Sequence, residues 1–396
     1  MNSYNLIPNS LLMFKSFFSK PQYIHLLSLM LGLIVAEKDK KNIQNISEIT
    51  GTKSQSSLNR FLTTSKWNAM NLLCSFVALL APSRRGGILI LDDTKNEKST
   101  DHTEGVSKLK DYVKGKFGFY HVMVSTLYVG FGRIMPMFLD LYMRETEASK
   151  MNMHFKTKID IGIELLKMCL KFVTPKAIVF DSWYLKKPLI DSLPTNVKWV
   201  SRLKINWLVS YHAKELPAKL LFCLVPKERF RHTKIKFGKS RYRWVTSVWV
   251  NVNALGRVKL VLLKKRRNSV SGIILASNAK WNMYEIIALY KKRWAIEVFY
   301  RDAKQHLGLG DYQITKLNAI IRHLTAVSLN YGILKNIKLM PEHDKTESKQ
   351  TIGEICRSMK SEYRIDKIVR ESLEVYENVK DIDKVVSIMK SRISNL

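Results

Sequence analysis

Hydrophobic and polar positions repeat with different periods in successive parts of the chain, and these changes divide it into regions. Apolar positions at helical spacing predict a helical region over residues 1–82. Short apolar runs and one amphipathic stretch predict an α/β core over residues 83–203. The two-residue period of strands dominates residues 204–277, which read as a β-rich insert. We expect residues 278–337 to complete the core and residues 338–396 to form a helical C-terminal region.

The N-terminal region contains two short apolar faces, between residues 43 and 62, that are separated by Gly51. A helix, a tight turn and a second helix fit this pattern, and Ser54 or Ser56 would cap the second helix. That helix would expose polar side chains in its first turns: Gln55, Asn59 and Arg60. A helix-turn-helix that enters a DNA groove and an ordinary helical hairpin give the same pattern, so both interpretations remain open.

Two short apolar runs are each followed by carboxylates. Residues 88–91 form an unbroken run before Asp92 and Asp93, and residues 177–180 form another before Asp181. Such runs are typical of central strands that are buried on both faces. Successive strand side chains point to opposite faces, so Asp92 and Asp93 cannot both enter one pocket. Carboxylates at such strand ends either cap the following loop or belong to a site. A polar loop is expected over residues 96–116.

Another acid lies in residues 283–307, which lack helix breakers and predict one long helix. At about 100° per residue, the side chains of Tyr290, Arg293, Glu297 and Lys304 share one stripe along that helix. The stripe borders a flank of mostly apolar positions that would face the core, and Tyr300 belongs to this flank. A solvated helix face with i,i+4 ion pairs has the same appearance, and helix geometry alone favours that interpretation.

The charge balance changes this interpretation. Lys and Arg number 66 against 33 Asp and Glu, so the formal net charge is +33, spread over the whole chain. This excess predicts a polyanionic partner, most simply nucleic acid; a merely basic protein and a membrane-surface binder fit it less well. Three tryptophans of the β-rich insert lie among cations: Trp207, Trp244 and Trp249. They suit stacking on bases, although core packing explains each of them equally well.

Cysteine spacing and hydropathy bear on the compartment. The 4 cysteines are far apart and form no CxxC pair, which favours free thiols in a reducing cytosol over disulfides or a zinc site. The apolar run at residues 24–36 is too short to span a bilayer, and the N-terminal residues lack a signal-peptide layout. We therefore expect a cytoplasmic protein that does not associate with membranes.

The acids Asp92 or Asp93, Asp181 and Glu297 are far apart in sequence. They can meet only if the fold brings strand ends together and a helix leans across them. Such a trio suits phosphodiester cleavage assisted by two divalent metal ions, which activate the attacking oxygen and stabilise the leaving oxygen. Mg²⁺ prefers hard carboxylate oxygens, so this chemistry needs no His or Cys ligand.

The segment YKKRWAIEVFYRDAK, residues 290–304, resembles the Y-(2)-R-(3)-E-(6)-K signature of bacterial insertion-sequence transposases. ILDDT and IVFDSWY resemble the first and second aspartate segments of that family, and residues 204–277 resemble its β-rich insert. The resemblance covers about residues 40–335. It implies an α/β fold: a ribonuclease-H-like mixed-sheet core with the insert, plus helical N- and C-terminal regions.

The resemblance also implies roles for individual residues. Three acids would form the DDE triad and bind two Mg²⁺ ions, for which Mn²⁺ would substitute: Asp92, Asp181 and Glu297. The family pattern Asp-x-Thr favours Asp92, and Asp93 remains the alternative. Three further side chains would contact DNA phosphates at the transposon end: Tyr290, Arg293 and Lys304.

The implied function is that of a transposase acting on double-stranded DNA. It would bind inverted-repeat ends, cleave them by metal-dependent hydrolysis and join the 3′-OH ends to target DNA, as a homodimer on DNA. In some relatives a tryptophan of the insert stacks on a flipped base. The resemblance does not indicate which tryptophan would do so here. Another nuclease of this fold, such as a junction resolvase, and a non-catalytic DNA-binding regulator remain alternatives. The C-terminal helices would dimerise or simply pack.

Overall fold

The computed structural model describes residues 6–37, 41–83, 85–111, 114–237, 239–336, 350–380 and 382–394. The chain forms two compact units. The sheet unit, which we name for the mixed sheet that it contains, consists of Asn68–Arg301 with Ile314–Ile321. The helical unit consists of Met1–Trp67, Asp302–Gln313 and Arg322–Leu396. Helices α11 (Trp294–His306) and α12 (Leu317–Asn336) contribute residues to both units. The finer domain boundaries expected from the sequence stay predictions.

The sheet unit is organised around one mixed sheet with the strand order β2-β3-β1-β5-β6-β12-β11-β10-β7-β8. Strand β4 also pairs with β3, and β9 with β10. The core strands are β1 (Ile88–Lys98), β2 (Ser107–Asp111), β3 (Lys116–Gly130), β4 (Arg133–Tyr142), β5 (Ala177–Phe180) and β6 (Trp199–Leu203). The insert supplies β7 (Leu208–Tyr211), β8 (Lys214–Pro217), β9 (Arg231–Phe237), β10 (Ser240–Val252), β11 (Gly256–Lys264) and β12 (Ile273–Ser277).

Strand directions confirm the predicted ribonuclease-H-like core. Strand β1 runs parallel to β5, and β5 runs parallel to β6. On its other side β1 is antiparallel to β3, which in turn is antiparallel to β4. The insert continues the same sheet, because β12 pairs with β6. The predicted mixed α/β core with a β-rich insert is therefore what the chain forms.

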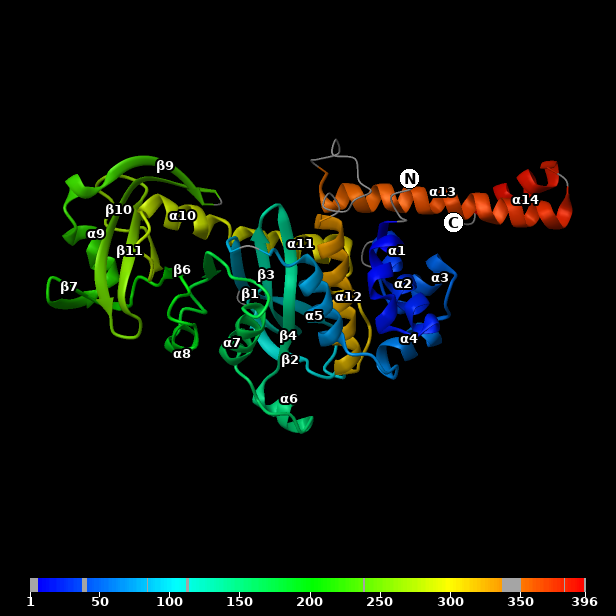
Figure 1. Ribbon diagram of the computed structural model, residues 1–396, viewed down its shortest axis with the longest axis horizontal. Coiled ribbons are helices and arrows are strands. Elements are labelled where there is room, and N and C mark those ends of the chain that lie inside the picture. Colours follow the sequence, from blue (N-terminus) through cyan, green and yellow to red (C-terminus); the bar gives the residue numbers. More distant parts are fainter. Residues whose placement is uncertain are drawn as a thin grey trace. The chain divides into compact units, whose positions relative to one another are not determined.

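Helices complete the sheet unit: α5 (Ala69–Leu80), α6 (Glu145–Lys150), α7 (Lys158–Cys169), α8 (Lys187–Asp191), α9 (Leu221–Leu224) and α10 (Met283–Lys291). Helices α5 and α7 pack on β4 beside β3, and α10 packs on β6 and β12 (Figure 1). Thr157 and Asp160 form a capping box that starts α7, whose apolar face then buries Ile161 and Leu165. Local sequence signals and burial against the sheet thus agree for this helix.

Strand β1 is longer than predicted. The sequence indicated a strand over residues 88–91 that ends at Asp92 and is followed by a polar loop from 96 to 116. Instead β1 continues to Lys98, because β3 pairs with it from Ile88 to Lys98 while β5 pairs only as far as Leu91. Strand β2 takes part of the predicted loop. Asp92 and Asp93 therefore lie inside a strand, at the position where its parallel partner ends.

The predicted single helix over residues 283–307 is also wrong, since the chain bends between α10 and α11. Lys292 N donates to Leu289 O at 3.1 Å and Arg293 N donates to Tyr290 O at 3.0 Å. These i→i−3 bonds tighten the turn although the segment contains neither Pro nor Gly. Arg293 lies at the bend, so Tyr290 and Glu297 do not share one straight helical stripe.

The helical unit matches the helical prediction for both ends of the chain. Its elements outside α11 and α12 are α1 (Leu6–Leu11), η2 (Leu12–Phe17), α2 (Lys20–Val35), α3 (Ile43–Thr50), α4 (Gln55–Thr63), α13 (Ile352–Val379) and α14 (Ile382–Ser394). The first part of the C-terminal region expected at residues 338–396, up to residue 349, lies outside the described residues. Within the described ranges, no helix combines the length and hydropathy needed to cross a membrane. The cysteines are free thiols.

A buried histidine is expected to make the stability of the sheet unit sensitive to acid. His121 of β3 donates from Nε2 to the carbonyl oxygen of Glu104 at 3.0 Å, and burial lowers its pKa to about 4. Between pH 4 and 6.5 the unfolded chain binds the extra proton, so stability decreases as the pH falls through this window. Between pH 7 and pH 5, we expect the free energy of unfolding of the wild type to decrease by about 2 kcal/mol more than that of His121→Gln. Urea unfolding at both pH values measures it, and an equal loss in the variant would contradict this prediction.

Candidate active site

Asp92 and Asp93 point to opposite faces of β1, as strand geometry requires. Asp92 Oδ2 pairs with Arg293 Nη1 at 2.6 Å. Asp93 Oδ2 pairs with Lys158 Nζ at 3.0 Å, and its Oδ1 accepts a hydrogen bond from the Tyr184 hydroxyl at 2.9 Å. The two neighbouring acids therefore have separate partners. Asp92 faces the bend before α11, whereas Asp93 is tied to α7.

Arg293 joins the strand acid to the helix acid. Its guanidinium donates from Nη1 to Asp92 Oδ2 at 2.6 Å and from Nη2 to Glu297 Oε1, in the first turn of α11. The three side chains are largely withdrawn from solvent, at 18%, 15% and 33% exposure for Arg293, Asp92 and Glu297. One cation thus holds both carboxylates at a single site. The bend between α10 and α11 puts this cation there.

Asp181 directly follows β5, next to the first acid. Leu91 and Phe180 are partners in the parallel ladder, so Asp92 and Asp181 occupy the next positions of neighbouring strands. Strands in a sheet are about 4.8 Å apart. Asp181 Oδ1 accepts hydrogen bonds from the backbone N–H of Trp183 at 2.8 Å and of Tyr184 at 3.3 Å. The following turn therefore fixes the orientation of this carboxylate.

Electrostatics link these carboxylates. Burial raises the pKa of Asp92 from 3.8 to about 7; the Arg293 guanidinium opposes this rise, and Asp181 adds to it. A buried carboxylate with so high a pKa gains free energy from binding a proton or a cation near neutral pH. Asp92 therefore lies next to Asp181 in the sheet and is joined to Glu297 through Arg293, at a position where burial disfavours its negative charge.

Tyr300 supports the first acid in a way that the sequence did not indicate. Its hydroxyl donates to the backbone carbonyl of Asp92 at 2.9 Å and lies 2.8 Å from Ser125 Oγ. Burial raises the pKa of Tyr300 well above its usual value. The helical pattern did place Tyr300 on the core-facing flank. A Tyr instead of a Phe at a buried position was the available signal, since its hydroxyl needs a partner there.

Two family models match this chain. A model described as a transposase DDE domain matches residues 156–333, and one described as a DDE superfamily endonuclease matches residues 13–219. The second covers more than half of the chain. The chain belongs to the DDE superfamily. This confirms the family that residues 290–304 and the two aspartate segments indicated, while the roles of single residues stay predictions.

A curated relative supports the same assignment for this DDE protein. It is a "Probable transposase for insertion sequence element IS701" from Microchaete diplosiphon, 24% identical over 206 residues. The match covers 50% of this chain and 50% of the relative. The chain therefore spans about half the length of that relative in the aligned region, and the likeness supports family membership more than any detail of activity.

The donor chemistry of the candidate site fits a divalent cation. Asp92, Asp181 and Glu297 offer only carboxylate oxygens, which are the ligands that Mg²⁺ and Mn²⁺ prefer. Among the described residues, no three His, Cys, Asp or Glu side chains are grouped closely enough to hold an ion. Instead the Arg293 guanidinium stands between two of the acids and supplies the positive charge. The candidate site therefore has suitable ligand chemistry, and Arg293 pairs two of its three acids, Asp92 and Glu297.

The residues expected to bind phosphate differ in their surroundings. Tyr290, at the end of α10, has its ring 6.0 Å from that of Phe237 in the insert, and burial raises its pKa. The Arg293 guanidinium lies 5.9 Å from the centre of the same ring. Lys304 lies in the last turn of α11, within the helical unit, and burial lowers its pKa. Phosphate binding by these three side chains stays a prediction.

Trp183 lies next to Asp181, to which its backbone N–H donates, and sequence reasoning did not single it out. It is 38% exposed and follows Asp181 by two positions. Lys158 Nζ lies 4.3 Å above its ring, and the ring of Tyr184 meets it at 5.0 Å, edge to face. Lys158 therefore contacts both Trp183 and Asp93. An aromatic residue after the second Asp was visible in the sequence, but its lysine partner comes from a different element.

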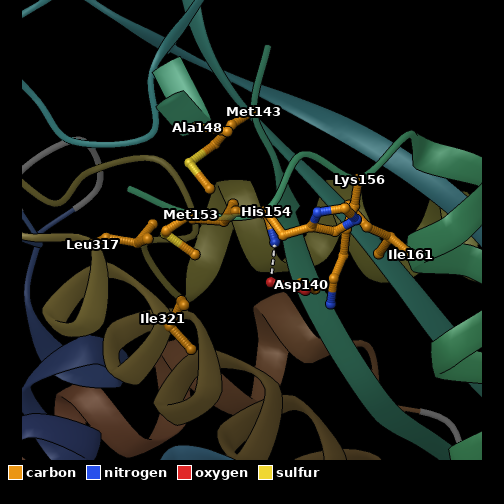
Figure 2. A pocket seen from close by; sticks show the side chains of 10 residues that line it. Asp140, Met143, Ala148, Met153, His154, Lys156, Ile161, Leu317 and Ile321 are labelled. Atoms are coloured by element: carbon orange, nitrogen blue, oxygen red, sulfur yellow. Dashed lines mark hydrogen bonds between the residues drawn. The ribbon is translucent and has the colours of Figure 1, made fainter. Parts of the chain in front are cut away.

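The DDE protein also has a small pocket that contains none of these acids (Figure 2). It measures about 70 Å³ and is lined by residues from β4, α12 and the segment around α6, among them Asp140, Met143, Met153, His154 and Leu317. Asp140 Oδ1 accepts a hydrogen bond from Leu141 N at 2.7 Å, and burial raises its pKa. This pocket does not belong to the candidate active site.

Proposed function

We propose that this protein is a transposase that binds the inverted-repeat ends of an insertion sequence, cleaves the DNA there by metal-dependent hydrolysis and joins the 3′-OH ends to target DNA. One observation carries the proposal: in a chain of the DDE superfamily, Asp92 and Asp181 are neighbours on parallel strands, and Glu297 shares a guanidinium with Asp92. The curated relative named as a probable insertion-sequence transposase supports it.

Within this proposal the three acids have one task and the nearby cations another. Asp92, Asp181 and Glu297 would hold two Mg²⁺ ions, which would activate water and stabilise the leaving oxygen of the phosphodiester. Arg293 and Tyr290 would then hold DNA phosphates beside the acids. Arg293 is well suited to this, because a guanidinium bonds a phosphate as readily as it bonds a carboxylate. Trp183 N–H and Tyr300 keep the acids oriented.

The proposed DNA partner agrees with the charge of the insert. Strands β9 and β10 expose several cations, namely Lys234, Lys236, Arg241 and Arg243. Lys236 and Arg241 face each other in register, so the two strands present charge together. Trp249 is 36% exposed and has Lys259 Nζ at 5.2 Å and the Arg257 guanidinium at 5.5 Å from its ring centre. Such a surface suits the phosphates of double-stranded DNA.

A homodimer on DNA is the proposed assembly. Helices α13 and α14 pack on each other through Val375, Ile368 and Ile388. Other apolar side chains of α13 remain exposed at four-residue spacing, namely Ile365, Val369 and Leu373. Since such a row would gain free energy from burial, it supports a second copy of this helix as its partner.

The proposal is tested by incubating the protein with DNA that carries the ends of its own element, in Mg²⁺ or Mn²⁺. We expect cleavage at the element ends, joining of those ends to a target plasmid, and loss of both reactions in Asp181→Asn and Glu297→Gln. Full cleavage by either variant would contradict the assignment of these acids to the catalytic triad. Cleavage of branched DNA without end recognition or joining would indicate a resolvase-type nuclease. Metal-independent binding without nicking would indicate a regulator.

A further inference from the structure

The pocket beside strand β4 has mostly apolar walls (Figure 2). Carbon and thioether surfaces come from five of its lining residues: Met143, Met153, Ile161, Leu317 and Ile321. Met153 is 44% exposed, so it lies at the rim, where the pocket meets solvent. A cavity of about 150 Å³ holds one benzene molecule, so the 70 Å³ of this pocket has room for about three non-hydrogen atoms. The pocket can therefore hold the end of a small molecule whose remainder extends into solvent.

A carboxylate without a paired cation lies in this pocket. Asp140 Oδ1 accepts a hydrogen bond from Leu141 N at 2.7 Å, whereas within the described part of the chain Asp140 Oδ2 has no hydrogen-bond or ion-pair partner. Lys156 also lines the pocket, but its Nζ donates to Glu164 Oε2 at 2.6 Å. Burial raises the pKa of Asp140, and the Leu141 N–H and Lys156 oppose this rise only in part. A ligand that brings a positive charge to Asp140 therefore gains free energy.

Contacts outside the pocket hold its walls in place. Glu104 N donates to Thr315 O at 2.9 Å, and Glu104 Oε2 accepts from Leu317 N at 2.8 Å, so the loop before β2 fixes the start of α12. Gly105 of the same loop has a φ of 74° and packs closely on two wall residues. A Cβ there would lie 3.0 Å from Leu317 Cδ1 and 3.2 Å from Met143 Sδ. The cavity is thus formed before any ligand enters, which lowers the cost of binding.

The chemistry of the pocket selects one class of ligand. Asp140 repels an anion, and a neutral apolar molecule would leave its carboxylate unpaired. The described residues that line the pocket include a single acid, whereas Mg²⁺ needs about six oxygen ligands. An ammonium group on an aliphatic chain satisfies both features of the site. Its N–H groups can form a charge-assisted hydrogen bond with Asp140 Oδ2, and its methylenes can pack on the thioethers of Met143 and Met153.

We propose that this pocket binds the end of an aliphatic primary amine, such as an alkylamine or a polyamine, and that Asp140 bonds the ammonium group while the apolar walls cover the adjoining methylenes. The site goes beyond the proposed function and does not depend on it. The ligand contacts β4, the segment around α6 and the start of α12 together. Because it binds only the folded arrangement of these elements, it stabilises the sheet unit.

Methyl NMR of the full-length protein, with isotope-labelled methionine and without DNA, tests this site. Butylammonium chloride and n-butanol are titrated separately at constant pH and ionic strength. We expect butylammonium to shift the methyl signals of Met143 and Met153, which the variants Met143→Leu and Met153→Leu identify, with a Kd of about 1 mM. n-Butanol has the same chain without the charge, so it should bind at least about 10-fold more weakly.

Asp140→Asn removes the charge but keeps the size of the side chain and the acceptor for Leu141 N, so this variant should fold. It should weaken butylammonium binding by about 10- to 150-fold and leave n-butanol binding unchanged. The matched control is Glu145→Gln, which removes one negative charge from an exposed position in the first turn of α6. It should change the Kd of butylammonium by less than about 2-fold, because exposed charges are screened.

Several outcomes would overturn the inference. One is equal binding of the two probes by the wild type, and another is unchanged butylammonium binding by Asp140→Asn. A loss in Glu145→Gln as large as that in Asp140→Asn would attribute the effect to general charge. The absence of saturable shifts of the Met143 and Met153 signals up to about 50 mM would also overturn it. None of these results bears on DNA cleavage, so the proposed function would stand in each case.

Discussion

Replacing Asp92 by Asn is expected to abolish DNA cleavage, with a loss on the order of 10³-fold or more, while the fold remains intact. The amide removes the charge that a divalent cation needs, yet it still accepts a hydrogen bond from Arg293. Burial raises the pKa of Asp92 to about 7, so above that pH the folded protein bears the unfavourable burial of a charge. The neutral side chain avoids this. We therefore expect Asp92→Asn to be at least as stable as the wild type at pH 8.

The sign of the pH dependence distinguishes this effect from ordinary damage. The folded-state pKa of Asp92 lies above its ordinary value of 3.8, so the folded protein binds the extra proton between pH 3.8 and about 7. The stability contribution of Asp92 is complete below pH 3.8 and is lost as the pH rises through 7. In metal-free urea unfolding, the free energy of unfolding of the wild type minus that of Asp92→Asn should decrease by about 1–3 kcal/mol from pH 5 to pH 8.

Asp93→Asn is the matched control, because it changes the neighbouring acid in the same strand. It breaks the pair with Lys158, whose Nζ lies 3.0 Å from Asp93 Oδ2, and should lower stability by about 1–3 kcal/mol. Cleavage should persist at temperatures where this variant is folded. The reverse outcome, with Asp93→Asn inactive and Asp92→Asn active, would make Asp93 the member of the triad.

Local signals explain what could be predicted from the sequence. The buried strands before Asp92 and Asp181 are short apolar runs, and Ser54 and Gly51 mark the start and end of helices through their own backbone preferences. The helical pattern also placed Glu297 in a helix, and it lies in the first turn of α11; its role as the third acid of the triad stays a prediction. Each of these features depends on a few neighbouring residues, so no knowledge of the tertiary structure was needed.

What could not be predicted depends on partners far away in sequence. Strand β1 passes Asp92 because β3 pairs with it to Lys98. The bend at Arg293 has no Pro or Gly to announce it. It brings the guanidinium to Asp92, 201 positions earlier. Tyr300 was expected in the core, but its bond to the Asp92 carbonyl follows only from the packed arrangement. The acids were predictable one by one, whereas their shared cation was not.

Replacing Arg293 by Gln is expected to make the stability of the protein depend on a divalent cation. The guanidinium pairs Asp92 at 2.6 Å and also pairs Glu297. Its removal leaves two largely buried carboxylates without a counter-charge, which lowers the free energy of unfolding by about 3 kcal/mol in metal-free buffer at pH 8. A bound cation stabilises whichever state binds it, and no arginine competes for the acids in the variant. Millimolar Mn²⁺ should therefore stabilise Arg293→Gln more than the wild type.

Urea unfolding with EDTA and with Mn²⁺ measures this difference without any DNA or catalytic step. Arg202→Gln removes an exposed arginine of β6 in the same sheet and should change stability by less than about 0.5 kcal/mol, with no added response to Mn²⁺. Adding Asp92→Asn to Arg293→Gln removes one of the unpaired charges, so the double variant should regain stability and lose most of its response to Mn²⁺. If Mn²⁺ stabilises wild type and Arg293→Gln equally, then Arg293 does not occupy the position of the cation. In that case either the cation lies outside the position of the guanidinium, or Asp92 and Glu297 do not bind it.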